Sequence, residues 1–486
     1  MNFSSSLFLL YFLPAFLLVY FLLGSRFRNV FTLGASAIFF FWGAPSFTFL
    51  LIVSILIDYY LSGAMHAASG KPRKTLLVFL LLLNLSMLLY FKYTGFFIVQ
   101  FNMMMGWLGL PRMPLLNVIL PLGISFITFQ KMSYLIDVYR GTTQPAEKLR
   151  DYALFIFFFP KLLAGPIVRY KEFAPRIAER KEFSGFEERL TGFFRFSLGL
   201  AKKVMIANVL GGYADEIFAT ETFLLNTKTA WLGAIAYSFQ IYFDFSAYSD
   251  MAIGLARMIG FNIKENFNNP YISVGITEFW KRWHITLGTW LRDYLFLPVA
   301  YALSRRMPEN KYLGLKTDKW LYIFASLITM LLCGFWHGAG WTFILWGLYH
   351  GVFMSVERLF LTKLMKKAGR VIAVFFTFFV VTLGWVIFRA DSLTHAVEIY
   401  SLMFSLNFQV VDFLITPQLI VLLIVSTVFS FWALAPGIEK WQMKIYTGIR
   451  TTNGLIAITV SAFILFIMGL SQVTASGFNP FIYFRF

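Results

Sequence analysis

The sequence predicts an all-α, polytopic membrane protein, and composition is the first reason. Of the 486 residues, 58% are hydrophobic and only 14% are charged, and the mean hydropathy is +0.69. Soluble domains are typically about 45–50% apolar and about 25% charged. A water-soluble globule, a disordered chain and a collagen-like chain are therefore excluded. Aromatic residues make up 20% of the chain, which suits a lipid-facing surface with aromatic belts at its interfaces.

The second reason is the distribution of charge. The net charge of +18 comes largely from short basic clusters that separate apolar segments, so nucleic-acid binding is not needed to explain it. Cytoplasmic loops of membrane proteins carry an excess of Lys and Arg. We therefore expect six clusters to lie in the cytoplasm: Arg26/Arg28, 71–74, 169–189, 305–319, 358–370 and 440–450.

The apolar segments between these clusters are the predicted membrane spans. Segment 7–23 is expected to be a retained helix, because it has neither the basic start nor the small-residue cleavage site of a signal peptide. This arrangement forms a single domain, 1–486, with a tail at 472–486 outside. It also places the loop 140–150 outside, although that loop is basic. The other predicted spans are 75–91, 95–110, 115–136, 152–167, 190–218, 230–258, 371–388, 412–434 and 454–471.

Segments 30–60 and 320–356 each join two cytoplasmic clusters, so each must enter the membrane and return. The 37 residues of the second are too few for two spans of about 20 residues. The glycine-rich run Gly334–Gly340 is the natural break between its limbs. A limb of about 15 residues, rising about 1.5 Å per residue, would place His337 roughly 22 Å deep. Irregular backbone at that depth must be buried in protein or line a wet cavity.

His337 is therefore the first candidate for chemistry, because an ionisable residue at membrane depth is a functional hypothesis by default. Trp336 and Trp341 flank it and are expected to contact a bound substrate. Apolar surroundings disfavour a charged imidazolium, and a general base must be neutral to accept a proton. From position alone, a core histidine bonded to a backbone carbonyl explains the residue equally well.

The segment 277–294 has the pattern of an amphipathic helix on the cytoplasmic membrane surface. Functionally, its polar face could border a donor entrance, where Lys281, Arg282 and Arg292 would contact phosphates. Helical spacing groups Phe279, Trp283, Leu287, Trp290 and Tyr294 on one face, and Thr277, Lys281, His284, Gly288 and Arg292 on the other.

Four carboxylates fall inside predicted spans. We expect each to contact another helix or pair with a buried Lys or Arg, while orientation of a catalytic histidine is the alternative for Asp244. Cys333, the single cysteine, excludes an intrachain disulfide and a cysteine-based metal site; it is expected to pack rather than react. No metal site is predicted. The four carboxylates are Asp58, Asp137, Asp244 and Asp250.

Five motif runs, taken together and in this order, resemble the membrane-bound O-acyltransferase family, in its bacterial branch that acetylates alginate or D-alanylates teichoic acid. The resemblance implies a ring of tilted helices, some short or re-entrant, around a central tunnel. It matches the family histidine of the Trp-His-Gly run to His337, and a second position, often Asn elsewhere in the family, to His284. The runs are 160–166, 244–254, 268–271, 279–294 and 335–341.

The resemblance also implies an activity. We expect acetyl transfer from acetyl-CoA, with no bound cofactor, across a bacterial inner membrane to an SGNH-type partner and then to an exported polysaccharide such as alginate. His337 would be the base, and His284 would position or polarise the donor carbonyl. The expected supporting residues are Asp244, Tyr248 and Asp250.

The C-terminal run Phe481–Phe486 favours the alginate-type branch, because the D-alanylation system carries a similar tail on a separate peptide. Its one hydroxyl, Tyr483, would be either an interfacial anchor or a transient acyl carrier. The alternatives are D-alanyl transfer to teichoic acid, a lipid acyltransferase, and a transporter or flippase that uses His337 and Asp244 as a proton relay. The absence of a visible internal repeat disfavours the transporter.

Overall fold

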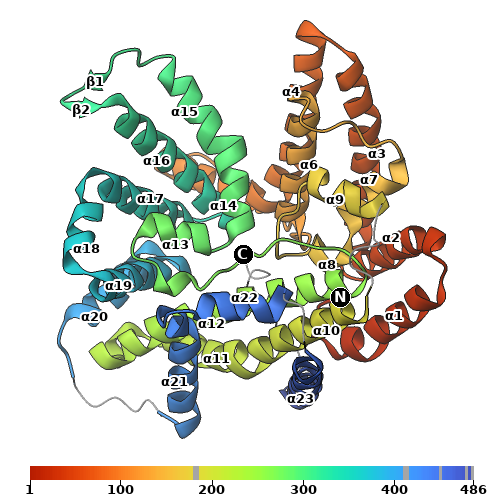
Figure 1. The fold of residues 1–486 in the computed structure, drawn as a ribbon. Coiled ribbons are helices and arrows are strands. Elements are labelled where there is room, and N and C mark those ends of the chain that lie inside the picture. The colour runs from red at the N-terminus through yellow and green to blue at the C-terminus, as the bar shows by residue number, and fades with distance from the viewer. Residues whose placement is uncertain (179–184, 409–414, 448–450, 477–479, 483–486) are drawn as a thin grey trace. The chain divides into compact units, whose positions relative to one another are not determined.

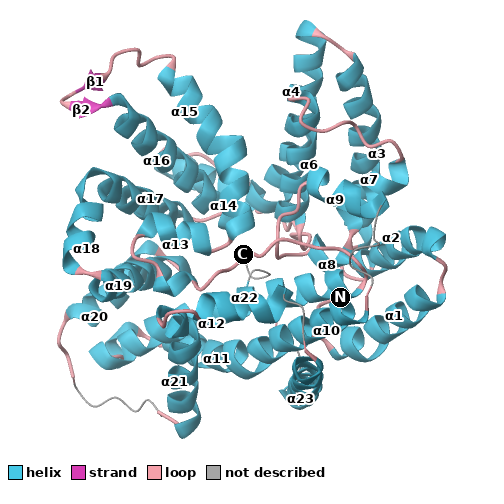
Figure 2. Ribbon diagram, in the orientation of Figure 1, coloured by secondary structure: helices cyan, strands magenta, loops and turns pink. Residues whose placement is uncertain are grey.

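The computed structural model describes residues 1–178, 185–408, 415–447, 451–476 and 480–482. Helices dominate this part of the chain, and β1 (Lys311–Tyr312) pairs with β2 (Leu315–Lys316) in a small antiparallel hairpin (Figure 2). Six helical segments of the described residues are long and apolar enough to span a membrane. The all-α, multi-pass class is therefore confirmed.

The chain divides into two compact units, and the prediction of a single domain stays a prediction. The first unit contains residues 1–196, 248–264 and 473–484, and the second contains 197–247, 265–472 and 485–486. Helices α10, α12 and α23 contribute residues to both. The first unit holds η1 (Phe8–Phe12), α1 (Leu13–Leu22), α2 (Ser25–Phe41), α3 (Pro45–Ala67), α4 (Gly70–Leu88), η2 (Leu89–Tyr93), α5 (Thr94–Trp107), α6 (Ile124–Tyr139), α7 (Leu149–Phe157), α8 (Phe159–Leu162), α9 (Tyr170–Ala178), most of α10 (Phe186–Ala201) and the end of α12 (Thr227–Met258).

Helices α2 and α3 are neighbours and form the hairpin expected of segment 30–60. By contrast, the prediction of two spans at 75–91 and 95–110 is wrong, since α4, η2 and α5 form one helix of 38 residues (Figure 1). The polar Lys92 and the following Thr-Gly pair suggested a loop, but a single π-turn keeps the chain helical there. At about 1.5 Å per residue this helix is about 57 Å long, well beyond a core of about 30 Å.

Losing one crossing moves the basic loop 140–150 to the cytoplasmic side. Helix α6 returns alongside α4, and the Arg73 guanidinium donates a hydrogen bond to the Tyr139 carbonyl at 2.7 Å. The predicted span 152–167 is also wrong. Helix α7 has only nine residues, and after the short α8 the chain comes back to α9, where Lys171 pairs with Asp137 at 3.3 Å. The topology now agrees with the positive-inside rule.

All four carboxylates in the predicted spans pair with a cation, as expected. In the first unit, Asp58 of α3 lies 3.2 Å from Lys131 of α6, and also accepts hydrogen bonds from Asn84 of α4 and Tyr152 of α7. The other pairs are Asp137–Lys171, Asp250–Arg195 at 2.7 Å and, in the second unit, Asp244–Lys203 at 2.5 Å.

The second unit carries most of the motif residues. Its elements, besides β1 and β2, are the end of α10, η4 (Lys202–Ala207), α11 (Asn208–Ala219), η5 (Thr222–Leu224), the first part of α12, η6 (Pro270–Ile272), α13 (Ile276–Arg282), α14 (Ile285–Leu291), η7 (Arg292–Phe296), α15 (Leu297–Ser304), α16 (Thr317–His337), α17 (Trp341–Val356), η8 (Glu357–Leu361), α18 (Thr362–Ala368), α19 (Arg370–Arg389), α20 (Leu393–Phe404), α21 (Pro417–Phe431), η9 (Trp432–Leu434), α22 (Ile438–Thr447) and most of α23 (Thr452–Ser476).

Helices α16 and α17 form the expected hairpin, which breaks at residues 338–340 and carries His337 at its tip (Figure 1). The expectation of a limb of about 15 residues is wrong, because α16 has 21 residues and is long and apolar enough to span a membrane. Their backbones touch. A Cβ at Gly334 would lie 2.2 Å from the Phe343 carbonyl oxygen, and a Cβ at Gly347 would lie 2.1 Å from the Met330 carbonyl oxygen. Small residues allow this close packing of helices in a membrane, so these glycines fix the position of the hairpin tip.

The revised topology can be tested by cysteine labelling. In a Cys333→Ser background, Asn117→Cys should react with a membrane-impermeant maleimide added outside, whereas Gln144→Cys should not. Both positions are exposed, and they lie at opposite ends of α6. In inverted vesicles the reactivities should exchange. Labelling of Gln144→Cys but not of Asn117→Cys from outside would restore the extra crossing.

Candidate active site

His337 is the last residue of α16 and is only 4% exposed. Aromatic rings from three helices surround it. Its ring centroid lies 4.8 Å from that of Trp336, 5.1 Å from Trp346 of α17 and 5.5 Å from Phe388 of α19. Gly338 is required next to it because an added Cβ would lie 2.2 Å from the Phe343 ring. The histidine thus sits where the helix ends, in a closely packed aromatic site.

His284 does not lie on a continuous amphipathic helix, so that prediction is wrong. Helix α13 ends at Arg282 and α14 begins at Ile285, and His284 between them has a left-handed backbone with φ 45°. Asn266 replaces the missing helical bonds. Its carbonyl oxygen accepts from the Ile285 N–H at 2.9 Å, and its side-chain oxygen accepts from the Thr286 N–H at 3.2 Å.

The His284 side chain is also not on a solvent-facing polar surface, because it is only 1% exposed. Its ring lies 4.7 Å from Phe245 of α12 and 6.4 Å from Trp336. Burial lowers the pKa of His284 to about 3, so this imidazole is neutral at any working pH. Trp336 contacts both histidines, so the structure brings His284 and His337 around one indole ring.

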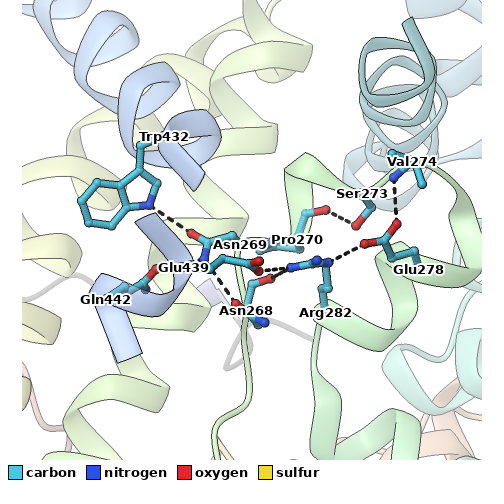
Figure 3. A network of polar contacts seen from close by, with 10 residues as sticks. All are labelled: Asn268, Asn269, Pro270, Ser273, Val274, Glu278, Arg282, Trp432, Glu439 and Gln442. Atoms are coloured by element: carbon cyan, nitrogen blue, oxygen red, sulfur yellow. Dashed lines mark hydrogen bonds and ion pairs between the residues drawn. The ribbon is translucent and has the colours of Figure 1, made fainter. Parts of the chain in front are cut away.

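Arg282 has partners that the sequence did not suggest. It bonds Glu278 at 2.8 Å, the Asn268 carbonyl at 3.2 Å, and Glu439 of α22 (Figure 3). Nearby, Asn269 donates to Gln442 at 2.9 Å and accepts from the Trp432 indole at 3.1 Å. We use the name strap for the segment 268–282 together with its partners Trp432, Glu439 and Gln442. Arg282 therefore acts within the strap, and these contacts give no support to a phosphate-binding role.

The other predicted donor contacts differ in exposure. Lys281 is exposed, and Arg292 pairs with Asp293 at 2.7 Å while keeping 61% of its side chain exposed. Trp336 is buried, whereas Trp341 at the start of α17 is 54% exposed. A cavity of about 280 Å³ also opens between α13, α18 and α19, with Lys366 among its lining residues. No predicted site residue lines that cavity.

The expected supporting residues fall in different units. Asp244, in the second, is held by Lys203. Tyr248 and Asp250 belong to the first, where the Tyr248 ring lies 5.0 Å from Phe3 and 4.9 Å from Phe481. Tyr483 lies outside the described residues. No group of three or more His, Cys, Asp or Glu suited to a metal ion occurs among those that the structure describes.

His350 and Asn266 were not predicted as site residues. His350 stands 13 residues from His337, but the rings of both histidines lie close to the same side chain, Trp346, with ring centroids 5.2 and 5.1 Å from that of Trp346. The hairpin geometry, which the spacing alone does not give, makes this possible. Asn266 lies in an ordinary polar stretch, and no sequence signal distinguishes it.

Comparison with known proteins identifies the family. A model described as MBOAT, membrane-bound O-acyltransferase family, matches residues 148–390. A probable alginate O-acetylase of Pseudomonas putida is 39% identical across the full length of both chains. The chain belongs to the membrane-bound O-acyltransferase family. It is therefore an O-acyltransferase, as the motif runs implied, and both histidines lie in the matched region.

Two further relatives differ in their named activities. A peptidoglycan O-acetyltransferase of Helicobacter pylori is 36% identical over 83% of this chain and 80% of the relative. A teichoic acid D-alanyltransferase of Bacillus subtilis is 30% identical over 59% of this chain and 72% of the relative. Relatives of this chain are thus named for the acylation of different polymers.

The role of Arg282 can be separated from donor binding. Arg282→Gln should lower the melting temperature, because the strap loses its ion pairs, but should leave the donor KM of the folded enzyme unchanged. The effect should be modest, since partly exposed ion pairs each contribute at most about 1 kcal/mol. The control is Lys281→Gln/Arg292→Gln, which should raise the donor KM at constant melting temperature. A raised KM without destabilisation in Arg282→Gln would instead support phosphate binding.

Proposed function

We propose that this chain transfers acetyl groups from a cytoplasmic thioester, acetyl-CoA, for the O-acetylation of an exported polysaccharide. The observation that carries the proposal is the pair of buried histidines around Trp336, one of them at the tip of the α16–α17 hairpin. A neutral base enclosed within a multi-pass membrane protein suits transfer between a cytoplasmic donor and an external acceptor.

In the proposed reaction His337 is the general base. It removes the proton of an acceptor hydroxyl as the oxygen attacks the thioester carbonyl. The carbon–sulfur bond then breaks, and the leaving CoA thiolate takes the proton from the imidazolium, so the base is regenerated. The Trp336, Trp346 and Phe388 rings limit access of water, which favours transfer over hydrolysis of the thioester.

The donor would enter from the cytoplasmic side. Lys281 near the end of α13 and Arg292 directly after α14 keep exposed charge, and they are our proposed contacts for the CoA phosphates. Trp336 would then line the path of the thioester, with Trp341 at the more exposed end of α17. His284, across Trp336 from His337, would position the donor. No residue of the proposed site requires a bound cofactor.

The comparisons favour acetyl over D-alanyl transfer. The alginate O-acetylase relative aligns over its full length, whereas the D-alanyltransferase relative aligns over 59% of this chain. Two relatives are named for acetylation of a glycan. We therefore propose an exported glycan such as alginate as the final acceptor, an SGNH-type partner as the intermediate acetyl carrier, and a bacterial inner membrane as the location.

His337→Ala tests the base directly. A general base contributes typically about 10²–10⁴-fold, so polymer acetate should fall by at least 100-fold at equal membrane abundance. His395→Ala, which changes a histidine of α20, should retain wild-type acetate. Acetate from polymer of cells expressing each variant is the measurement. Wild-type levels in His337→Ala would remove the proposed mechanism.

Tyr483 is the proposed relay on the outer side. A phenol of pKa about 10 becomes a nucleophile when a base takes its proton, and its ester is a better acyl donor than a sugar ester. The preceding Phe481 and Ile482 are buried, and Phe481 packs on Tyr248, so this part of the tail packs within the protein.

Tyr483→Phe keeps the aromatic ring and removes the hydroxyl. If Tyr483 carries the acetyl group, polymer acetate should be lost almost completely. If Tyr483 is only an interfacial anchor, polymer acetate should change little. The matched control is Tyr301→Phe, at an exposed tyrosine of α15. Full activity in Tyr483→Phe would leave His337 to serve the partner directly.

A further inference from the structure

We propose that Asn266 is a positioning residue that fixes the tautomer of His284, so that Nδ1 carries the proton and Nε2 is the nitrogen that accepts hydrogen bonds. The inference rests on the proposed function for its consequence, but its geometry stands independently. Asn266 is fully buried and belongs to the segment that precedes η6.

The orientation of the Asn266 amide follows from its backbone contact. Its Oδ1 lies 3.2 Å from the Thr286 backbone nitrogen and 2.8 Å from the Thr286 hydroxyl. A backbone N–H can only donate, so the Asn266 atom that faces it must be the oxygen. Oxygen and nitrogen of an amide are often assigned from such contacts rather than seen; here the main chain decides.

The same oxygen lies 3.1 Å from His284 Nδ1. An oxygen that only accepts requires a donor opposite, so Nδ1 carries the hydrogen. In a neutral imidazole the other nitrogen, Nε2, then bears the lone pair. Burial keeps the ring neutral, and the tautomer is therefore defined.

Asn266 also stabilises the backbone turn that orients the His284 ring. Its carbonyl oxygen accepts from the Ile285 N–H at 2.9 Å, beside the left-handed His284. A non-glycine residue in such a conformation is strained and persists only where its surroundings determine it. One buried amide residue thus fixes both the main-chain turn and the protonation of the histidine.

This geometry distinguishes two roles for His284. A neutral ring with hydrogen on Nδ1 cannot donate from Nε2, so it cannot polarise the donor carbonyl by a hydrogen bond. It can accept from an N–H or O–H of a reactant, such as an amide of the pantetheine arm or the acceptor hydroxyl. His284 would therefore orient a reactant by accepting, while His337 acts as the base.

Phe245 of α12 and Trp336 of α16 contact the His284 ring, and Asn266 makes a polar contact with its Nδ1. The titratable groups close in sequence to these two aromatic residues are Cys333 and His337 of α16, and Tyr242, Asp244 and Tyr248 of α12, of which Asp244 is paired with Lys203. An acid placed at position 266 would therefore act on His284 first.

Asn266→Asp tests the proposal. The carboxylate keeps an acceptor for all three donors but stabilises an imidazolium, so it raises the pKa of His284. The Nε2 lone pair is then lost as the pH falls through the raised pKa. The ratio of variant to wild-type kcat/KM should fall about tenfold for each unit of pH below that value, and should be constant above it.

His284→Asn is the matched background, because asparagine has no proton to gain and often occupies this position in the family. There, Asn266→Asp should cause no pH-dependent loss. Asn266→Leu, which removes the acceptor, should lower kcat more than it changes the donor KM. A pH-dependent loss that persists in the His284→Asn background, or none in the wild-type background, overturns the inference.

Nitrogen NMR of protein labelled with ¹⁵N-histidine gives a readout that does not require acetyl transfer. The His284 signals are those lost in His284→Asn. They should show a protonated Nδ1 and an unprotonated Nε2, whether or not acetyl-CoA is the donor. The opposite tautomer contradicts the inference alone, whereas correct tautomers with no acetyl transfer contradict the proposed function alone.

Discussion

Satisfying buried charge inside a membrane protein is the constraint on which this structure depends. In hydrocarbon, water cannot solvate a carboxylate or an ammonium, and removing one partner of a buried pair costs roughly 3–5 kcal/mol. The Asp58–Lys131 pair, with Asn84 and Tyr152, joins helices α3, α4, α6 and α7. Polar side chains that lie up to 94 residues apart in the sequence thus determine which helices of the first unit are neighbours.

The same constraint explains why the candidate histidines occur where helices break. A break releases backbone groups that need partners, and at the Trp283–His284 junction Asn266 supplies them. At the hairpin tip, glycines bring α16 and α17 into backbone contact, and aromatic rings enclose His337. Neutral imidazoles suit such surroundings better than charged groups would.

The sequence predicted the features that depend on length and local pattern. The length of segment 320–356 predicted the hairpin, and the acids within apolar segments predicted the buried ion pairs. The sequence-based prediction failed where contacts between distant residues determine the local structure. Helical periodicity continues through His284, and only Asn266, 18 residues away in sequence, interrupts it. Likewise, the sequence pattern suggested a break between two spans near Lys92. Hydropathy does not reveal the π-turn that keeps the chain helical there. Of the site, both histidines and Trp336 were predicted; the tautomer and the strap were not.

The strap links the last fifth of the chain to the candidate site. Trp432, Glu439 and Gln442 lie beyond residue 390, where the match to the family model ends, yet they bind the segment that leads into His284. A helix outside the matched region therefore supports a loop inside it. Substitutions in that helix can consequently alter the position of His284 while both histidines stay unchanged.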